Sequence, residues 1–200
     1  MALSITSIVN MALGRFGAQK LSTYEDDATP NGILARLFYE QTRDALLRSH
    51  EWRFALAREA LSEEEDTPAF EWDHQYLLPA DFLRLTGLYN TTASFAIEGD
   101  KILTNDDAVD LVYVRRVTDP TDFDPLFVEV LVLQLAIKFH LSLSEDRHLR
   151  QSMQEELVRL LARVRTVNKQ ETNNVGESDM GLWNNARLGG TSIGSRMGQP

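Results

Sequence analysis

The chain has 200 residues, of which 43% are hydrophobic, and its 20 Lys and Arg against 30 Asp and Glu give a formal net charge of −10 at pH 7. This size is enough to bury a core and is typical of one domain with room for a small insertion and a tail. No Lys or Arg cluster stands clear of acidic residues, which argues against a surface that binds nucleic acid by neutralising phosphates. Cysteine is absent, so disulfides and thiolate metal sites are excluded, in keeping with a protein made in a reducing cytoplasm.

The first eight residues lack the basic start and long apolar run of a signal peptide. The most apolar stretch, residues 128–143, is interrupted by charged and polar side chains. We therefore expect neither a signal peptide nor a membrane span.

Two helices are predicted before residue 50. Apolar residues from 4 to 16 recur at the three- and four-residue spacing of an amphipathic helix. After a polar loop, Thr29 is suited to cap a second helix and Pro30 to fill its first turn, and this helix is expected to run from about residue 31 to 49.

The apolar period changes to two after residue 50, which predicts strands. Alternate residues from 52 to 56 and from 70 to 76 are apolar or aromatic, and an acidic loop at residues 63–66 separates the two runs. Pro79 is expected to end the second strand because it has no backbone N–H to donate. The remaining predicted strands are residues 83–89, 95–98, 101–103 and 109–117, with Gly99 and Asp100 forming a hairpin turn between two of them.

Helices are expected to resume after residue 123. Asp124 is placed to cap and Pro125 to occupy the first turn of a helix that reaches about residue 143. This helix is apolar on nearly every side, so we expect it to be the most buried element. A further helix begins near residue 144, and its apolar stripe of Leu149, Met153, Leu157, Leu160, Val164 and Val167 fits one long helix.

The composition changes abruptly at residue 171 to Asn, Gly and Ser. Alone, such a tail is expected to be disordered, because only residues 182–188 offer apolar surface to bury. Trp183 in this glycine-rich arm is suited to anchor in a groove of a partner protein. The alternative is that Trp183 folds back onto its own domain.

No residue pattern in the chain demands catalysis, a cofactor or a metal. His140 and His148 come nearest to a metal pair, but no His-Glu-x-x-His spacing is present and a core or surface role is favoured. Asp119, Asp122 and Asp124 loosely resemble a calcium loop, yet prolines interrupt them, which favours turns and helix capping. No phosphate-binding glycine loop and no Gly-x-Ser-x-Gly elbow is found.

Two further groups of residues have an ordinary structural interpretation. The acidic runs at residues 25–27 and 63–66 are expected to be solvated loop charge. Trp52, Phe54, Trp72 and Tyr76 offer the aromatic faces of a ligand-stacking platform, but alternating aromatic residues on a strand are more often sheet core.

Four segments in this order resemble the head-tail adaptors of short-tailed bacteriophages, the tail tubular protein A family. They are LLRSHEWRFA at residues 46–55, YLLPADFLRL at 76–85, DLVYV at 110–114 and FDPLF at 123–127. The resemblance covers about residues 3–168, and residues 183–188 resemble the C-terminal arm of such proteins. Each segment consists of residues suited to packing in a core, so no single segment is diagnostic of the family. The specificity of the resemblance lies in the order and spacing of the four segments.

The resemblance implies a ring of about twelve copies seated under the capsid portal and carrying the tail nozzle, with tail fibre proteins as further neighbours. Genomic DNA would pass through the lumen without sequence-specific binding, and the acidic charge would keep it from sticking. The protein would be made in the host cytoplasm and retained in the neck of the virion, with no membrane contact. The inserted sheet would face outward or downward, toward the nozzle and adjacent subunits.

We therefore predict an α+β, mainly α fold. A helical bundle of about four helices, from residues 1–50 and 119–170, is expected to carry an inserted small antiparallel β-sheet subdomain at 51–118 and an extended C-terminal arm at 171–200. The interaction residues expected in the arm, which would bind the portal and neighbouring subunits, are Leu182, Trp183, Ala186, Arg187 and Leu188.

Two alternatives from other classes stay open at this point. One is a soluble enzyme or small-molecule-binding domain, which would need a concave pocket with converging polar groups. The other is a phage assembly chaperone that is not retained in the finished virion. No catalytic residue, cofactor or metal ligand is assigned under the adaptor interpretation.

Overall fold

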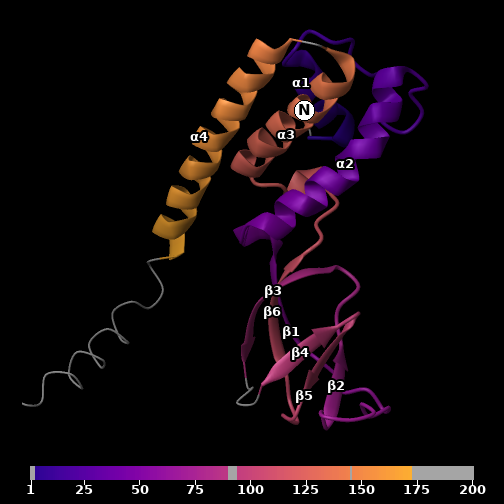
Figure 1. The fold of residues 1–200 in the computed structure, drawn as a ribbon, viewed down its shortest axis with the longest axis vertical. Helices are drawn as coiled ribbons and strands as arrows, with labels where there is room; N and C mark the ends of the chain where they lie inside the picture. Colours follow the sequence, from indigo (N-terminus) through magenta and orange to yellow (C-terminus); the bar gives the residue numbers. More distant parts are fainter. Residues whose placement is uncertain (1–2, 90–93, 145, 173–200) are drawn as a thin grey trace, which may run out of the picture. The chain divides into compact units, whose positions relative to one another are not determined.

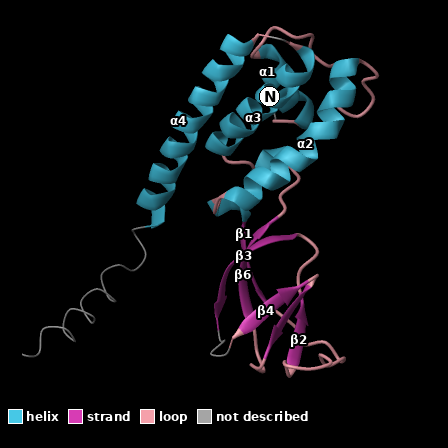
Figure 2. Ribbon diagram, in the orientation of Figure 1, coloured by secondary structure: helices cyan, strands magenta, loops and turns pink. Residues whose placement is uncertain are grey.

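The computed structural model describes residues 3–89, 94–144 and 146–172, and its elements follow the predicted order (Figures 1 and 2). Across these residues the fold is α+β, with four α-helices and two small antiparallel sheets of three strands each. Contacts divide the chain into two units, Met1–Leu161 and Ala162–Pro200. The first unit contains three of the helices, both sheets and the beginning of the fourth helix.

Helices α1 (Ile5–Gly14) and α2 (Pro30–Ser49) begin at side-chain caps. The Ser4 hydroxyl accepts a hydrogen bond from the Ser7 amide and the Ser7 hydroxyl accepts one from the Ser4 amide, which together form a capping box. The Thr29 hydroxyl accepts the Gly32 amide at 3.3 Å, with Pro30 in the first turn. Both predicted helices, and the cap expected at Thr29, are confirmed.

Helix α3 (Pro125–Leu143) is the core of the helical part, as its all-round apolar character predicted. The Asp124 carboxylate accepts the amides of Leu126 and Phe127 and so starts the helix. By length and composition α3 would also suit a membrane span, and 61% of its most apolar window is buried inside the protein. Its buried residues are Phe127, Val130, Leu131, Val132, Leu133, Leu135, Ala136, Phe139 and His140.

Helix α4 (Arg147–Thr172) begins after Asp146, whose carboxylate accepts the amides of His148 and Leu149. Its first turns are held to the helical core, since Met153 is buried and Glu156 pairs with Arg15 of α1 at 3.1 Å. This confirms one helix in the predicted place.

The strands form two sheets, where the sequence had suggested one small sheet. One sheet has the order β1-β6-β3 and the other β2-β5-β4, and each is antiparallel throughout. Strand pairing between distant segments, such as β1 with β6, leaves no local mark in the sequence. The strands are β1 (Leu56–Ala60), β2 (His74–Leu77), β3 (Phe82–Tyr89), β4 (Phe95–Glu98), β5 (Lys101–Thr104) and β6 (Asp110–Arg115).

The two sheets share one hydrophobic core and therefore form a small sandwich. From β2 and β5 come Tyr76 and Ile102, and from β6 come Leu111 and Tyr113, all nearly inaccessible to solvent. The hairpin between β4 and β5 turns at Gly99, whose φ of +63° favours glycine, so this predicted turn is confirmed.

Two predicted strand segments were wrong in part. Residues 53–55 form the 3-10 helix η1 (Arg53–Ala55), and β1 begins only at Leu56. The second predicted strand forms only from His74 onward. In the first segment, Trp52 and Phe54 pack on Phe127 of α3, which is distant in the sequence. In the second segment, Phe70 lies in solvent. Alternating aromatic residues therefore form no strand in either place.

Candidate functional site

The predicted arm contacts Leu182, Trp183, Ala186, Arg187 and Leu188 lie outside the described residues. The arm contacts therefore stay a prediction. What the structure does place is the set of segments that carried the family resemblance.

Parts of all four segments meet where the helices join the sandwich. We call this region the joint and define it by Asp44, Arg48, Trp52, Phe54, Asp81, Leu83, Tyr113, Arg116, Phe123 and Phe127. Helix α2 contacts both β3 and β6 there.

Aromatic rings fill the apolar part of the joint. Trp52 is 2% exposed and its Nε1 donates to the Leu46 carbonyl at 3.1 Å, at the end of α2. Its ring meets Phe127 edge-on, with centroids 5.0 Å apart. Phe54 lies 5.2 Å from Phe127 and 6.0 Å from Phe123. The predicted role of Trp52 and Phe54 as strand-face aromatics was wrong, because α3 draws both rings into its own core.

Arginine side chains form the polar part of the joint. Arg48 of α2 donates to the Leu83 carbonyl of β3. Arg116, just after β6, donates from its side chain to Asp44 at 3.0 Å and from its backbone to the Asp81 carbonyl at 2.6 Å. The helices and the sandwich are therefore tied by directional bonds as well as by packing.

The side chain of Asp81 connects the joint to the sandwich core. The Tyr113 hydroxyl donates to Asp81 Oδ1 at 3.0 Å. Burial of the phenol and the neighbouring Asp81 carboxylate raise the pKa of Tyr113. Tyr113 is therefore neutral at physiological pH and works as a hydrogen-bond donor.

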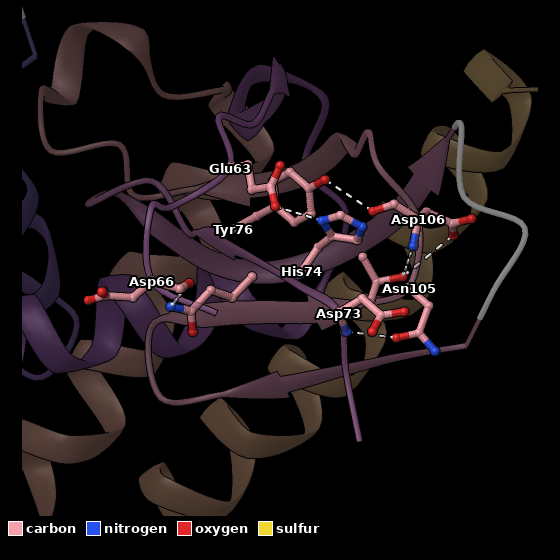
Figure 3. A network of polar contacts seen from close by, with 9 residues as sticks. Glu63, Asp66, Asp73, His74, Tyr76, Asn105 and Asp106 are labelled. Carbon is pink, nitrogen blue, oxygen red and sulfur yellow. Dashed lines mark hydrogen bonds and ion pairs between the residues drawn. The ribbon is translucent and has the colours of Figure 1, made fainter. Parts of the chain in front are cut away.

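A second polar region lies at one end of the sandwich, around the loop of residues 63–73 (Figure 3). His74 Nδ1 lies 2.6 Å from Glu63 Oε1, and Glu64 forms an ion pair with Lys101. The Gln75 side chain donates to the Asp66 carbonyl at 2.6 Å. Residues 63–66 lie in a loop, as expected, and Glu63, Glu65 and Asp66 are exposed, but Glu63 and Glu64 also hold the loop against β2 and β5.

The other side of this region is closed by residues after β5. The Asp73 amide donates to Asn105 Oδ1 at 2.9 Å, and the Tyr76 hydroxyl donates to the Asp106 carbonyl at 3.0 Å (Figure 3). Tyr76 itself belongs to the sandwich core, as predicted. The loop is thus fixed at both ends.

The Glu63 carboxylate, through its hydrogen bond, raises the pKa of His74. A raised pKa in the folded state means that the contact stabilises the loop below the ordinary histidine pKa and loses that effect as pH rises through the raised value. In an NMR titration of the full-length protein, His74 should titrate above the ordinary value. In the Glu63→Gln variant its pKa should fall back. An unchanged His74 pKa in that variant would contradict the contact.

Phe70 is the most exposed large apolar side chain of the described residues, at 81%. The Trp72 amide donates to the Phe70 carbonyl at 2.9 Å, and Glu71 between them has a φ of +73°, so these residues form a strained γ-turn. Beside it lies a hollow of about 280 Å³, whose lining includes Trp72, Lys101 and Leu103. The prediction that Phe70 and Trp72 belong to a strand was wrong, since the γ-turn lies there, and Trp72, expected as sheet core, is half-buried.

In the acidic run at residues 25–27, Glu25 and Asp26 are exposed as expected, but Asp27 is not. Asp27 is 8% exposed, and its carboxylate accepts the amides of Ser22 and Thr29. Hydrogen bonds from Thr29 lower the pKa of Asp27. The Asp27 carbonyl also accepts a bond from Arg36 of α2 at 2.9 Å. An Asp two residues before a helix-capping Thr-Pro pair is the pattern that could have indicated this role.

Neither histidine nor aspartate side chains gather into a metal site in the described part of the chain. His140 is fully buried with its ring edge-on to Phe16, so it is a core residue, as favoured. Asp119 accepts the Thr121 amide and caps the short helix η2 (Pro120–Asp122), and Asp124 caps α3. The turn and capping interpretation of these aspartates is confirmed.

Comparison with protein-family models gives no match, and comparison with curated proteins gives none either.

Proposed function

We propose that this chain is a structural virion protein, the head-to-tail adaptor of a short-tailed bacteriophage. Copies would form a ring of about twelve between the portal and the tail nozzle, with tail fibre proteins as possible neighbours and genomic DNA passing through the lumen. The observation that supports this most is the joint. Parts of segments 46–55, 76–85, 110–114 and 123–127, which carry the resemblance, contact one another there through Trp52 with Phe127, Arg48 with Leu83 and Tyr113 with Asp81.

The surface of α2 supports self-assembly. Ile33 and Leu37 are one helical turn apart and are 56% and 55% exposed. Neighbouring exposed apolar side chains of this kind are typical of a surface that a partner covers. A ring contact between subunits would bury them.

The charge supports a channel role. A net charge of −10 repels DNA, so a lumen lined by such a protein would let DNA pass without holding it. Binding to the portal would be left to the arm beyond residue 170, which carries Trp183 and few charges.

Negative-stain imaging of the full-length protein mixed with the portal protein of the same genome tests the proposal. We expect a ring capping the outer end of the portal. A monomer that ignores the portal would overturn the proposal and favour a soluble enzyme or binding domain. Absence of the protein from finished virions would favour an assembly chaperone.

Deletion of residues 171–200 should abolish portal docking while leaving the fold of residues 3–170 intact. The reason is that the arm contributes the proposed contacts Leu182, Trp183, Ala186, Arg187 and Leu188, whereas the contacts described for the helical core and the sandwich lie before residue 171. Docking is measured by co-sedimentation with the portal, and folding by the thermal unfolding midpoint. Normal docking by the truncated protein would sink the arm hypothesis.

A further inference from the structure

In the described part of the chain, the sandwich has an open side between β3 and β4. Each of these strands is the outer strand of its sheet, and the two do not pair with each other. Ile97 of β4 stands opposite the fully buried Ile102, so its side chain faces the core. It is nevertheless 41% exposed. An inward-facing apolar side chain in solvent indicates a place where a partner can complete the core.

A hollow of about 610 Å³ lies at this open side, next to the joint, and we call it the arginine hollow. Its apolar lining includes Phe82, Leu85 and Ile97, and the first two also pack against the sandwich core. Its charged lining consists of three arginines from α2, β3 and the residues after β6, namely Arg48, Arg84 and Arg116. A chain of net charge −10 therefore has a hollow that combines apolar side chains with three guanidinium groups.

The chain neutralises these arginines only in part. Arg116 pairs with Asp44, but Asp44 also pairs with Arg43, so one carboxylate serves two guanidinium groups. Arg84 Nη2 lies 3.3 Å from Glu51 Oε1 without a hydrogen bond. The Nε of Arg84 is shielded from solvent and has no hydrogen-bond partner among the described residues. The arginine hollow therefore suits an anionic partner that brings further acceptors.

The loop around Phe70 is complementary to the arginine hollow. Residues 63–73 contain six Asp and Glu and no Lys or Arg. Phe70 is 81% exposed and lines the hollow beside the γ-turn together with the exposed Glu71. Lys101, which lines that same hollow, is paired with Glu64. An exposed aromatic ring on an acidic loop matches a hollow of apolar side chains and guanidinium groups in both charge and polarity.

The loop that carries Phe70 is held in place before any partner binds. Glu63 and Asp73 fix it through the bonds shown in Figure 3, and Glu64 fixes it through an ion pair. The γ-turn at Glu71 sets the direction of the Phe70 backbone. A preorganised loop loses little conformational freedom on docking, so more of the interaction energy remains for affinity.

We propose that the Phe70 loop of one copy binds in the arginine hollow of a second copy. The Phe70 ring covers the apolar side chains at the open side of the sandwich, and the carboxylates of the loop meet the arginines. DNA phosphates match the arginines alone, because they offer no apolar group to Phe82, Leu85 and Ile97.

The proposed contact is heterologous, because it joins two different surfaces. No described residue lines both hollows, so one copy can use both surfaces at once. Such head-to-tail contacts close into rings when the rotation between copies allows it. This inference rests on the proposed function, because it supplies a contact of the adaptor ring.

Cysteine cross-linking tests the contact directly, because the native chain has no cysteine. Full-length Phe70→Cys and Ile97→Cys proteins are mixed with the portal protein and treated with a short bis-maleimide. We expect a covalent dimer of the chain from this mixture and none from either variant alone. Tyr89→Cys is the matched control for Ile97→Cys, because Tyr89 is 56% exposed on the sandwich and does not line the arginine hollow. Its mixture with Phe70→Cys should give no dimer.

Charge reversal gives an independent readout. Glu71→Arg brings a further cation to the arginine hollow, so the concentration of chain that half-fills the portal should rise at least about tenfold. Glu155→Arg is the matched control, since it makes the same change of charge at an exposed position of α4 and should leave that concentration unchanged. Co-sedimentation with the portal at low salt measures both effects. Equal effects of the two variants would overturn the contact.

The failures can be told apart. Rings on the portal without the Phe70–Ile97 cross-link would overturn this contact, assign the arginine hollow to another acidic partner and leave the adaptor function standing. Absence of any ring in the imaging experiment would overturn the adaptor function, and the contact with it.

Discussion

Replacing Trp52 by alanine should destabilise the protein by about 3–5 kcal/mol, the usual cost of deleting a buried large aromatic side chain. Trp52 is 2% exposed, stacks edge-on with Phe127 at 5.0 Å and donates to the Leu46 carbonyl at 3.1 Å. The substitution removes this packing and leaves the carbonyl at the end of α2 without its indole partner. Urea unfolding followed by circular dichroism measures the loss.

Two further variants serve as comparisons for Trp52→Ala. Trp52→Phe keeps most of the ring packing and loses the indole hydrogen bond, so it should cost roughly 1–2 kcal/mol. Trp72→Ala removes the same side chain from a half-buried position in the 63–73 loop, and its cost should lie well below that of Trp52→Ala. Equal losses at residues 52 and 72 would contradict the central place of Trp52 in the joint.

The effect of Trp52→Ala should reach beyond stability. The joint fixes the sandwich to the helices through few residues, so in the proposed adaptor a loosened joint would leave the sandwich in variable orientation relative to the helices. Portal-bound rings of the variant should then show blurred sandwich density in averaged images, while the helical ring stays sharp. The same blurring with Trp72→Ala would contradict this role.

The helix boundaries could be predicted from the sequence because their causes are local. Thr29 with Pro30, and Asp124 with Pro125, act on amides two or three residues away, so a short window contains the whole interaction. The hairpin at Gly99 is local in the same sense. The all-round apolar character of α3 likewise indicates a buried helix wherever its neighbours come from.

The sheets and loops were harder to predict because their causes are distant. Trp52 and Phe54 alternate like strand residues, yet Phe127, more than seventy residues later, determines where their rings lie. The division into two sheets depends on β1 pairing with β6, whose partners are 50 to 58 residues apart, from Ala60 with Asp110 to Leu56 with Val114. Phe70 resembles a core residue by type, and only the γ-turn at Glu71 places it in solvent.

The candidate contacts likewise divide into those with a local cause and those with a distant one. The segments of the joint were singled out by their order in the chain, but their contacts with one another were not predicted, because the contacting residues are far apart in the sequence. The acidic loop was identified as charge but its role was missed, because the bonds of Glu63 and Glu64 reach residues of other strands. Asp27 was missed for the opposite reason, as a local turn that its neighbour Thr29 could have revealed.

Replacing Gly32 by alanine should destabilise the protein by about 1–3 kcal/mol, although alanine is the better helix former by about 1 kcal/mol. A Cβ at this position would lie 2.3 Å from the Asp27 carbonyl oxygen and 2.8 Å from the Asp27 Cβ. Backbone atoms cannot swing away as a flexible side chain can, so the loop before α2 or the helix itself must shift. The same carbonyl accepts a bond from Arg36, which the shift would also disturb.

Gly14→Ala is the matched control, because it makes the same chemical change at the end of another helix. No atom lies within 4 Å of a Cβ at Gly14, so the variant should be as stable as the parent or gain up to about 1 kcal/mol. Urea unfolding of both variants separates the two effects, since helix propensity acts in the same direction at both sites and steric conflict acts only at residue 32. Stability of Gly32→Ala equal to that of Gly14→Ala would show that the approach of α2 to Asp27 is looser than described. A large loss at residue 32 alone would mean that the Asp27 loop and α2 form one rigid corner, which holds the start of the helix that leads to the joint.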